Sequence, residues 1–164
     1  MRLGVHVSIR NGFDGAVEEA LRSGCETMQV FTRSPRTWSA RFLTVEESKK
    51  FIKLLEKHRI FPLVVHTPYL PNLCTSDDQL FKKSVKLLKD DIKRSAHLKA
   101  EYLVIHPGAY SEGKSVVEGT RRFVKALDLV CPEIPEGMYL LLETMAGGGR
   151  RLGSSFEWLS GILD

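Results

Sequence analysis

The sequence lacks any hydrophobic run long enough to cross a membrane. Its longest apolar stretches, such as residues 61–65 and 140–142, fall far short of the roughly 18–20 residues that a membrane-spanning helix needs. Met1 is not followed by a basic region and an apolar segment, which is the pattern of a secretory signal. We therefore expect a cytoplasmic protein with no membrane partner.

Cysteine is scarce, and the common nucleotide-binding loops are missing. Cys25, Cys74 and Cys131 are odd in number and far apart, which favours packing roles in a reducing compartment over a disulfide framework. Neither a GxGxxG motif nor a P-loop follows the first apolar run. This absence argues against a nucleotide-binding open sheet.

The composition is that of a folded domain of ordinary size. The 164 residues are 43% hydrophobic, and 24 Lys and Arg against 20 Asp and Glu give a formal net charge of +4. These values predict a single globular domain spanning residues 1–164. The modest positive charge neither requires nor excludes a nucleic-acid partner.

A strand-helix unit recurs along the chain. Five short apolar runs rich in β-branched residues each precede a polar loop and a segment with helical periodicity, which is typical of strands buried on both faces of a parallel sheet. Four of the expected helices follow a capping box, a hydroxyl residue with Glu or Gln three positions on. The expected strands are residues 3–6, 28–31, 63–66, 103–106 and 139–143, and the boxes are Thr44 with Glu47, Ser76 with Gln79, Ser115 with Glu118, and Ser154 with Glu157.

The spacing of these units matches part of an α/β barrel. Successive strand ends lie 25–40 residues apart, about the chain length of one unit in a (β/α)8 TIM barrel of roughly 250 residues. Five units are counted, whereas eight close a barrel. The sequence therefore predicts either an open doubly wound sheet or a partial TIM barrel of about five βα units.

Polar side chains terminate four of the five apolar runs. His6, His66, His106 and Glu143 each stand where an expected strand ends. Because the carboxyl ends of parallel strands meet on one rim, these side chains should converge there. A lone histidine at a strand end is more often a hydrogen-bonded core residue, but imidazoles with a carboxylate on one rim are typical of a divalent metal site, with zinc the usual ion.

The loop after the second expected strand is basic and aromatic. Residues 32–42 include Arg33, Arg36, Arg41, Trp38 and Phe42 but no acidic residue. Arginine pairs with phosphates and aromatic rings stack on bases, so the loop is a candidate nucleic-acid contact. The plainer alternative is an ordinary basic loop with Trp38 packed into the core.

Several short motifs follow one another along the chain. They are residues 4–8 (GVHVS), 31–38 (FTRSPRTW), 66–73 (HTPYLPNL), 83–84 (KS), 106–108 (HPG), Glu143, 146–147 (AG) and 152–153 (LG). In this order and with these gaps they resemble the endonuclease IV family of zinc-dependent apurinic/apyrimidinic (AP) endonucleases of DNA base excision repair. The resemblance covers nearly the whole chain, as far as residue 163.

The resemblance implies a TIM barrel with three zinc ions at the carboxyl rim. It also implies hydrolysis of the phosphodiester 5′ to an abasic site in double-stranded DNA by a zinc-activated hydroxide. His66, His106 and Glu143 match metal ligands, and Glu143 matches a carboxylate bridging two ions, which also makes it the catalytic candidate. His6 matches a supporting histidine of the rim.

The resemblance also assigns DNA contacts. Arg36 matches a side chain that enters the DNA near the lesion, and Tyr69 with Leu70 matches a loop that holds the flipped-out abasic nucleotide. From the composition of the loop, we add Arg33 and Trp38 to the expected DNA-binding residues.

This sequence departs from the family pattern in two respects. Thr144, Met145 and Gly148 replace the Asn, Thr and Gln that usually follow the bridging glutamate. The family's remaining ligands, in Asp-x-x-His and Asp-x-His motifs, a further His and a last Glu, do not occur in these 164 residues. At most about one of the three zinc ions would have most of its ligands here, and we expect the isolated chain to cleave feebly or not at all.

Two other functions stay open at this level. The first is a metal-dependent sugar isomerase or epimerase of the similar xylose-isomerase-like barrels, and the second is an inactive truncated remnant that only binds DNA or metal. An unclosed barrel would also leave the edges of its first and last strands bare, which predicts self-association.

Overall fold

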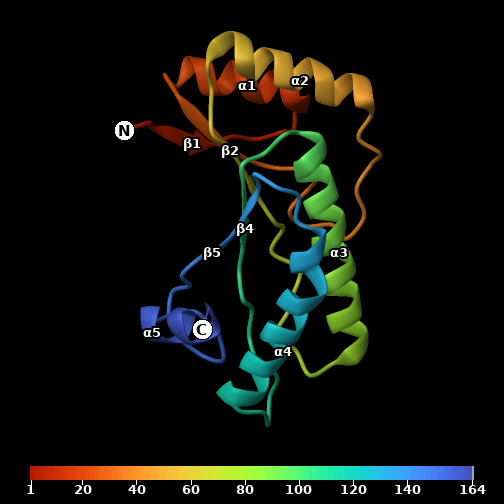
Figure 1. The fold of residues 1–164 in the computed structure, drawn as a ribbon, viewed down its shortest axis with the longest axis vertical. Helices are drawn as coiled ribbons and strands as arrows, with labels where there is room; N and C mark the ends of the chain where they lie inside the picture. Colours follow the sequence, from red (N-terminus) through yellow and green to blue (C-terminus); the bar gives the residue numbers. More distant parts are fainter. Residues whose placement is uncertain (164) are drawn as a thin grey trace.

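In a computed structural model that describes residues 1–163, five βα units follow one another along the chain (Figure 1). None of the helices among these residues is long and apolar enough to span a membrane. The elements are β1 (Gly4–His6), α1 (Gly12–Arg22), β2 (Thr27–Phe31), α2 (Val45–His58), β3 (Leu63–His66), α3 (Asp78–His97), β4 (Tyr102–Ile105), α4 (Val116–Val130), the short 3-10 helix η1 (Cys131–Glu133), β5 (Tyr139–Leu142) and α5 (Phe156–Leu163).

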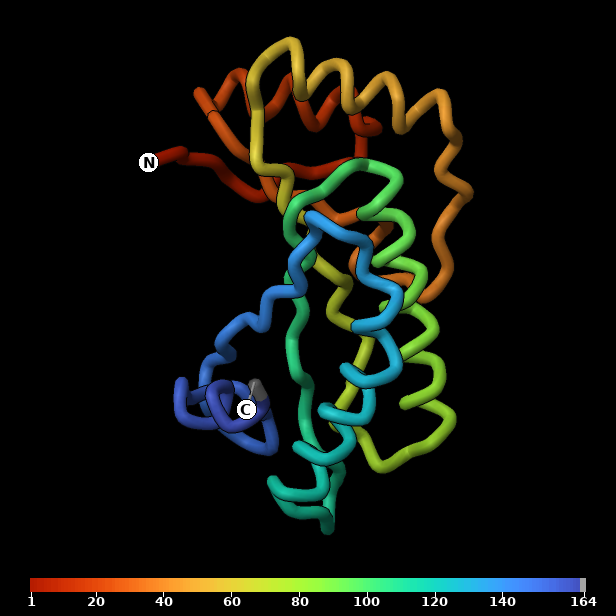
Figure 2. Tube along the Cα trace, viewed as in Figure 1, coloured from red at the N-terminus to blue at the C-terminus, as the bar shows by residue number. Residues whose placement is uncertain are grey.

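The strands form one parallel sheet whose spatial order is the order of the chain, β1-β2-β3-β4-β5. A doubly wound sheet reverses its strand order at a switch point, whereas a TIM barrel adds each strand beside the previous one. Helices α1 to α4 gather on one side of the strands, whereas α5 lies on the opposite side from α3 and α4 (Figures 1 and 2). The alternative of a doubly wound sheet is thus excluded, and the partial barrel is confirmed.

The core lies between the sheet and helices α1 to α4. Met28, Val30, Val65 and Leu103 of the three central strands are almost fully buried, as is Phe51 of α2. Burying an aliphatic or aromatic side chain of this size contributes about 1.5–3 kcal/mol. The helical wall is therefore held to the strands by ordinary apolar packing.

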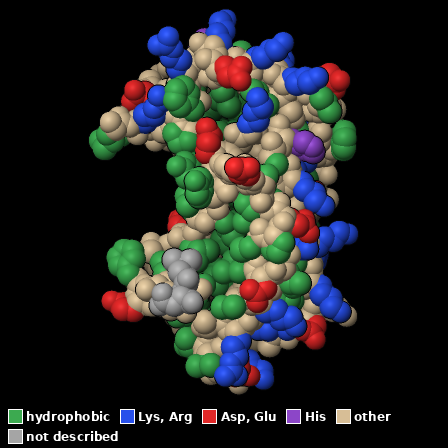
Figure 3. Space-filling view, viewed as in Figure 1, with side chains coloured by type: hydrophobic (Ala, Val, Ile, Leu, Met, Phe, Trp, Pro, Cys, Tyr) green, Lys and Arg blue, Asp and Glu red, His purple; other side chains and the backbone are tan. Residues whose placement is uncertain are grey.

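The two edge strands differ from the three central ones. All three residues of β1 are exposed, and exposed residues alternate with half-buried ones along β5. Val5 is 50% exposed and Leu141 is 39% exposed. The space-filling view shows hydrophobic side chains lying open on one hollowed side of the molecule (Figure 3). The prediction that all five strands are buried on both faces is wrong at these edges, because no further strand covers them in the described chain.

Two of the four capping boxes are confirmed, at Thr44 and Ser115. The other two helices begin one residue later than expected. At α3 the carboxylate of Asp77 accepts hydrogen bonds from the amides of residues 79 and 80, because an anion at a helix amino terminus is favoured by the helix dipole. At α5 the hydroxyl of Ser155 accepts from the amide of Trp158 at 3.2 Å.

The cysteines do not share one environment. Cys25 and Cys74 are buried, as predicted. Cys131 is exposed at the start of η1, so its expected packing role is corrected: the turn after α4 lies outside the helix-sheet interface.

Candidate metal centre

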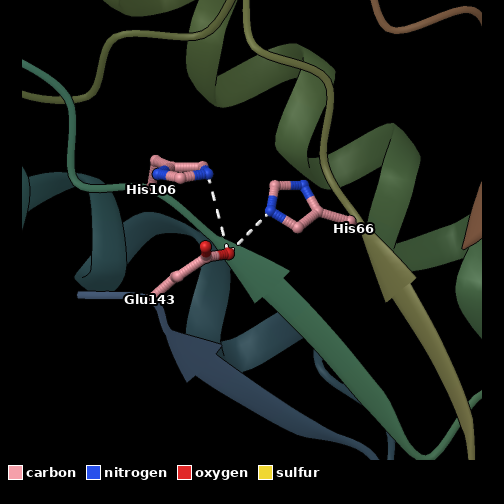
Figure 4. Close-up of side chains that lie close together, drawn as sticks. All are labelled: His66, His106 and Glu143. Carbon is pink, nitrogen blue, oxygen red and sulfur yellow. Dashed lines mark hydrogen bonds and ion pairs between the residues drawn. The ribbon is translucent and has the colours of Figure 1, made fainter. Parts of the chain in front are cut away.

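The three side chains of the candidate metal centre stand at the carboxyl ends of adjacent strands. His66 is the last residue of β3, while His106 and Glu143 directly follow β4 and β5. Ile105 pairs with Leu142 in the sheet register, so His106 and Glu143 are neighbours across the next step. The parallel register therefore brings together residues 40 and 37 positions apart in the chain (Figure 4).

The donor atoms of these residues converge on one carboxylate oxygen. Glu143 Oε2 lies 2.8 Å from His66 Nε2 and 3.6 Å from His106 Nε2, and all three donor atoms lie within 4.8 Å of one another. Ligands about 2.1 Å from a tetrahedral zinc ion lie about 3.4 Å from each other. The two separations from Glu143 Oε2 lie on either side of this value, so the three side chains are candidates to bind a single ion.

The tautomer of His66 gives a second test of this fit. Its Nδ1 lies 2.5 Å from the carbonyl oxygen of Thr67, and because a carbonyl can only accept, Nδ1 carries the hydrogen. Nε2 lies 2.8 Å from Glu143 Oε2, so either a proton on Nε2 or a bound metal ion must lie between the two acceptors. In the neutral ring Nε2 offers the lone pair that a metal needs, and a backbone carbonyl on the second nitrogen is the usual support of a metal-binding histidine.

His106 is held in a drier environment than Glu143. Burial lowers the pKa of His106, while Glu143 opposes that shift by favouring the charged ring. A neutral imidazole is the form that binds metal. The Glu143 side chain is 44% exposed, so the centre is open on its carboxylate side, where a reacting group could approach.

His6 lies beside this centre but outside it. Its Nδ1 is 2.8 Å from Gln29 Nε2, and its ring lies 4.4 Å from the ring of Phe31 and 6.2 Å from that of His66. Burial and the proximity of His66 both lower the pKa of His6. Its position agrees with a supporting role, which stays a prediction.

A cavity of about 390 Å³ opens next to the centre. Tyr69, 67% exposed, places its ring 5.9 Å from the ring of His66 and 6.1 Å from that of His106. Leu70 is half-buried and does not line the cavity, whereas Arg151 does. Of the two expected loop residues, Tyr69 is therefore the one in position to meet a ligand held at the metal.

The loop of residues 32–42, called here the arginine loop, divides its predicted DNA contacts. Arg36 is exposed, and Trp38 is half-buried, with the ammonium of Lys83 lying 4.2 Å from its ring centroid. The Arg33 side chain is only 2% exposed and forms ion pairs with Asp90 and Asp91 of α3. The expectation that Arg33 contacts DNA is thus corrected: its guanidinium is committed to carboxylates of that helix.

Two of the residues after Glu143 that differ from the family pattern, Met145 and Gly148, can be related to the path of the loop. The Met145 amide donates to the Gly153 carbonyl at 2.9 Å, and Met145 is one of the residues that line the cavity. Gly148 has φ +124°, a conformation that L side chains rarely adopt. Glycine at this position therefore permits a loop path that glutamine would strain.

Together, a partial α/β barrel and a histidine-carboxylate cluster on its carboxyl rim define the class: a barrel protein with a candidate metal site. The family described as Xylose isomerase-like TIM barrel matches residues 17–164. The chain belongs to this family.

Several relatives carry the name "Probable endonuclease 4", and two of them illustrate the similarity. The one from Halothermothrix orenii is 40% identical over 100% of this chain and 59% of its own length. The one from Natronomonas pharaonis is 37% identical over 100% of this chain and 58% of its own. The chain thus spans about three fifths of the length of these relatives.

Solved structures give the same fold. Endonuclease IV from Thermus thermophilus matches with a TM-score of 0.83 and 37% identity, over 99% of this chain and 59% of that one. A D-tagatose 3-epimerase-like protein matches with a TM-score of 0.77 and 20% identity, over 98% of this chain and 60% of that one. The second likeness is one of fold alone.

Proposed function

We propose that this chain carries one zinc centre of an endonuclease IV-type enzyme, which hydrolyses the phosphodiester 5′ to an abasic site in double-stranded DNA. The observation that carries the proposal is the convergence of His66, His106 and Glu143 within 4.8 Å on the rim where barrel enzymes place their active sites. The relatives named endonuclease 4 support the reaction class.

Different residues of the chain would bind the metal and receive the substrate. His66, His106 and Glu143 would hold the metal, with the Thr67 carbonyl fixing the tautomer of His66. When bound, zinc supplies a Lewis acid toward the phosphate oxygens. Tyr69 borders the cavity beside the centre, where an unpaired abasic nucleotide, which loses little stacking when it flips out, could be received.

The positive side chains of the rim complete the proposed DNA contact. Arg36 extends from the arginine loop, and Arg150 and Arg151 are exposed in the loop after β5. Arginine pairs with phosphate oxygens through two parallel hydrogen bonds. A sugar epimerase has less use for exposed arginines at this rim, and its support here is a likeness of fold at 20% identity.

The test is zinc binding together with cleavage of an abasic duplex. We expect about one tightly bound zinc ion per chain, its loss in Glu143→Gln, and unchanged binding in Glu136→Gln, a control at an exposed glutamate outside the cluster. A metal-dependent epimerase would bind zinc but show no salt-dependent retention on abasic DNA.

Cleavage is expected to be feeble in the 164-residue chain, since a single metal cannot stabilise both the attacking and the leaving oxygen. Robust metal-dependent nicking by this chain would contradict that expectation. Normal cleavage by the Glu143→Gln variant of an active, longer enzyme would overturn the assignment of the centre.

We also propose that residues 1–164 form one domain that self-associates through the unpaired edges of β1 and β5. β1 and β5 leave Val5, Leu141 and Tyr139 exposed, and bare parallel edges template further pairing. Sedimentation should show self-association that increases with concentration. A stable monomer at all concentrations would argue against it.

A further inference from the structure

We propose that Asp91 and Arg94 of α3 are positioning residues: together they hold the arginine loop in a single conformation, and so determine where Arg36 and Trp38 meet DNA. The DNA part of this inference rests on the proposed function. The loop-fixing part rests on the contacts between α3 and the loop alone.

Asp91 fixes the beginning and the middle of the loop. Its Oδ1 accepts a hydrogen bond from Thr32 Oγ1 at 3.1 Å and from Arg33 Nε at 2.8 Å. Arg33 in turn donates through Nη1 to the carbonyl of Trp38 at 3.2 Å, and its Nη2 pairs with Asp90. One buried carboxylate is thereby connected to the backbone that carries the exposed part of the loop.

Arg94 joins the two ends of the same loop. It donates through Nε to Thr32 Oγ1 at 3.2 Å and through Nη1 to the carbonyl of Arg41 at 2.9 Å, and its Nη2 bonds to the carbonyl of Thr32. Lys83, two turns before Asp91, covers the ring of Trp38. Helix α3 therefore contacts the loop at its start, its middle and its end.

The cluster is buried and charged, which is a costly way to obtain stability alone. The side chains of Arg33 and Asp91 are 2% and 1% exposed, and Asp91 Oδ2 has no hydrogen-bond partner among the described residues. Replacing a buried ion pair by apolar residues is often neutral or stabilising, whereas ionic groups can select one conformation. Here the conformation selected is that of a polar loop with few apolar side chains to pack.

Arg36 shows the opposite behaviour, as a side chain that contacts another molecule should. It is exposed, and among residues 1–163 its guanidinium makes no hydrogen bond or ion pair, since only its backbone amide contacts Ser34. A loop already ordered before binding avoids the entropic cost of ordering it in the complex. The contacts that fix Arg33 would thus also fix the position of Arg36, three residues further along the loop, whose guanidinium stays free to bind.

The experiment uses Asp91→Asn, which keeps the shape but removes the charge, and Arg94→Lys, which keeps the charge but cannot reach both carbonyls. Asp78→Asn is the matched control, because it removes a carboxylate of the same helix that pairs with Arg122 and not with the loop. All variants carry Trp158→Phe, so that Trp38 is the only tryptophan.

Loop order is measured without DNA, by tryptic cleavage after Arg36 and Arg41 and by acrylamide quenching of Trp38. We expect faster cleavage and stronger quenching in Asp91→Asn and Arg94→Lys, and native values in Asp78→Asn. Zinc affinity should stay unchanged in all three. Affinity for an abasic duplex should fall about tenfold in the two loop variants, the cost of ordering a few side chains on binding.

The outcomes separate this inference from the proposed function. If both variants keep the native loop order, Asp91 and Arg94 do not fix the loop. If the loop is disordered but DNA affinity stays native, the two residues do not position the DNA contacts. If Asp91→Asn does not fold, Arg94→Lys decides. If the parent chain binds zinc but no abasic DNA, the proposed function is wrong, and so is the DNA role of the arginine loop. The proteolysis result still decides whether Asp91 and Arg94 hold that loop in one conformation.

Discussion

The candidate metal centre and the arginine loop lie at the same edge of the sheet but are fixed by different means. His66, His106 and Glu143 are placed by strand register, each directly at the end of a strand. The arginine loop has no regular structure over most of its length and depends on buried charges of α3. Residues on a regular scaffold inherit their positions from it, whereas an irregular loop needs side-chain partners of its own.

The largest expected effect separates the two arginines of the loop. Arg33→Ala would leave Asp91 buried without its ion pair, and removing one partner of such a pair costs about 3–5 kcal/mol. Arg36→Ala should change the free energy of unfolding by less than about 0.5 kcal/mol, as is usual for an exposed residue. Urea unfolding of both variants measures the difference.

DNA binding should separate the two arginines in another way. Arg36→Ala is expected to weaken binding of an abasic duplex without disturbing the fold or zinc binding, whereas any loss of DNA affinity in Arg33→Ala should accompany the loss of stability. If both substitutions proved equally mild toward urea, Arg33 would not be the buried structural residue that its 2% exposure indicates.

The next prediction concerns the metal centre and the histidine beside it. His66→Ala removes one of three converging ligands and should weaken zinc binding more than about 100-fold, beyond the usual effect of altering a residue that only supports a ligand. His6→Ala should weaken it by about tenfold at most, because His6 lies outside the cluster. Competition with a chromophoric chelator gives both affinities. If the two variants lost zinc affinity equally, His6 would have to be counted among the metal ligands.

This contrast also explains how much the sequence could predict. The change from apolar to polar residues at the ends of the strands is local, and so His66, His106 and Glu143 could be named in advance. The ion-pair partners of Arg33, Asp90 and Asp91, are 57 and 58 residues away on a helix, and no local pattern links them to Arg33. The same limit applies to the edge strands, whose apolar residues look like core residues until the sheet is seen to end there.

The capping residues show a finer version of this limit. Ser76 and Asp77 are adjacent, and either could cap α3 by its residue type alone. Asp77 does so, while the amide of Ser76 donates to Ser111 Oγ at 2.9 Å. The negative charge of Asp77 favours it at the helix amino terminus, and the contact of Ser76 with another loop is one that the local sequence does not indicate.

The smallest expected effect lies at the outer end of the arginine loop, where the anchor is exposed. Arg41 pairs with Glu47 at 2.6 Å, and their side chains are 60% and 35% exposed. The hydrogen bond from Arg41, followed by that from the Thr44 amide, lowers the pKa of Glu47 from 4.5 to about 2. A lowered pKa means that the stabilisation is complete above pH 4.5 and is lost as the pH falls toward 2.

Glu47→Gln isolates this charge, since glutamine can still complete the capping box of α2. At about pH 7 we expect a loss of only a few tenths of a kcal/mol, because an exposed pair is screened by solvent, and the difference from the native chain should vanish near pH 2. Glu46→Gln, an exposed carboxylate in the same helical turn, controls for charge near the helix amino terminus. If Glu47→Gln lowered the free energy of unfolding by the same amount at every pH, the hydrogen-bond geometry and not the charge would hold this end of the loop. The buried contacts of Arg33 and Arg94 and the exposed pair of Arg41 with Glu47 would then differ only in packing.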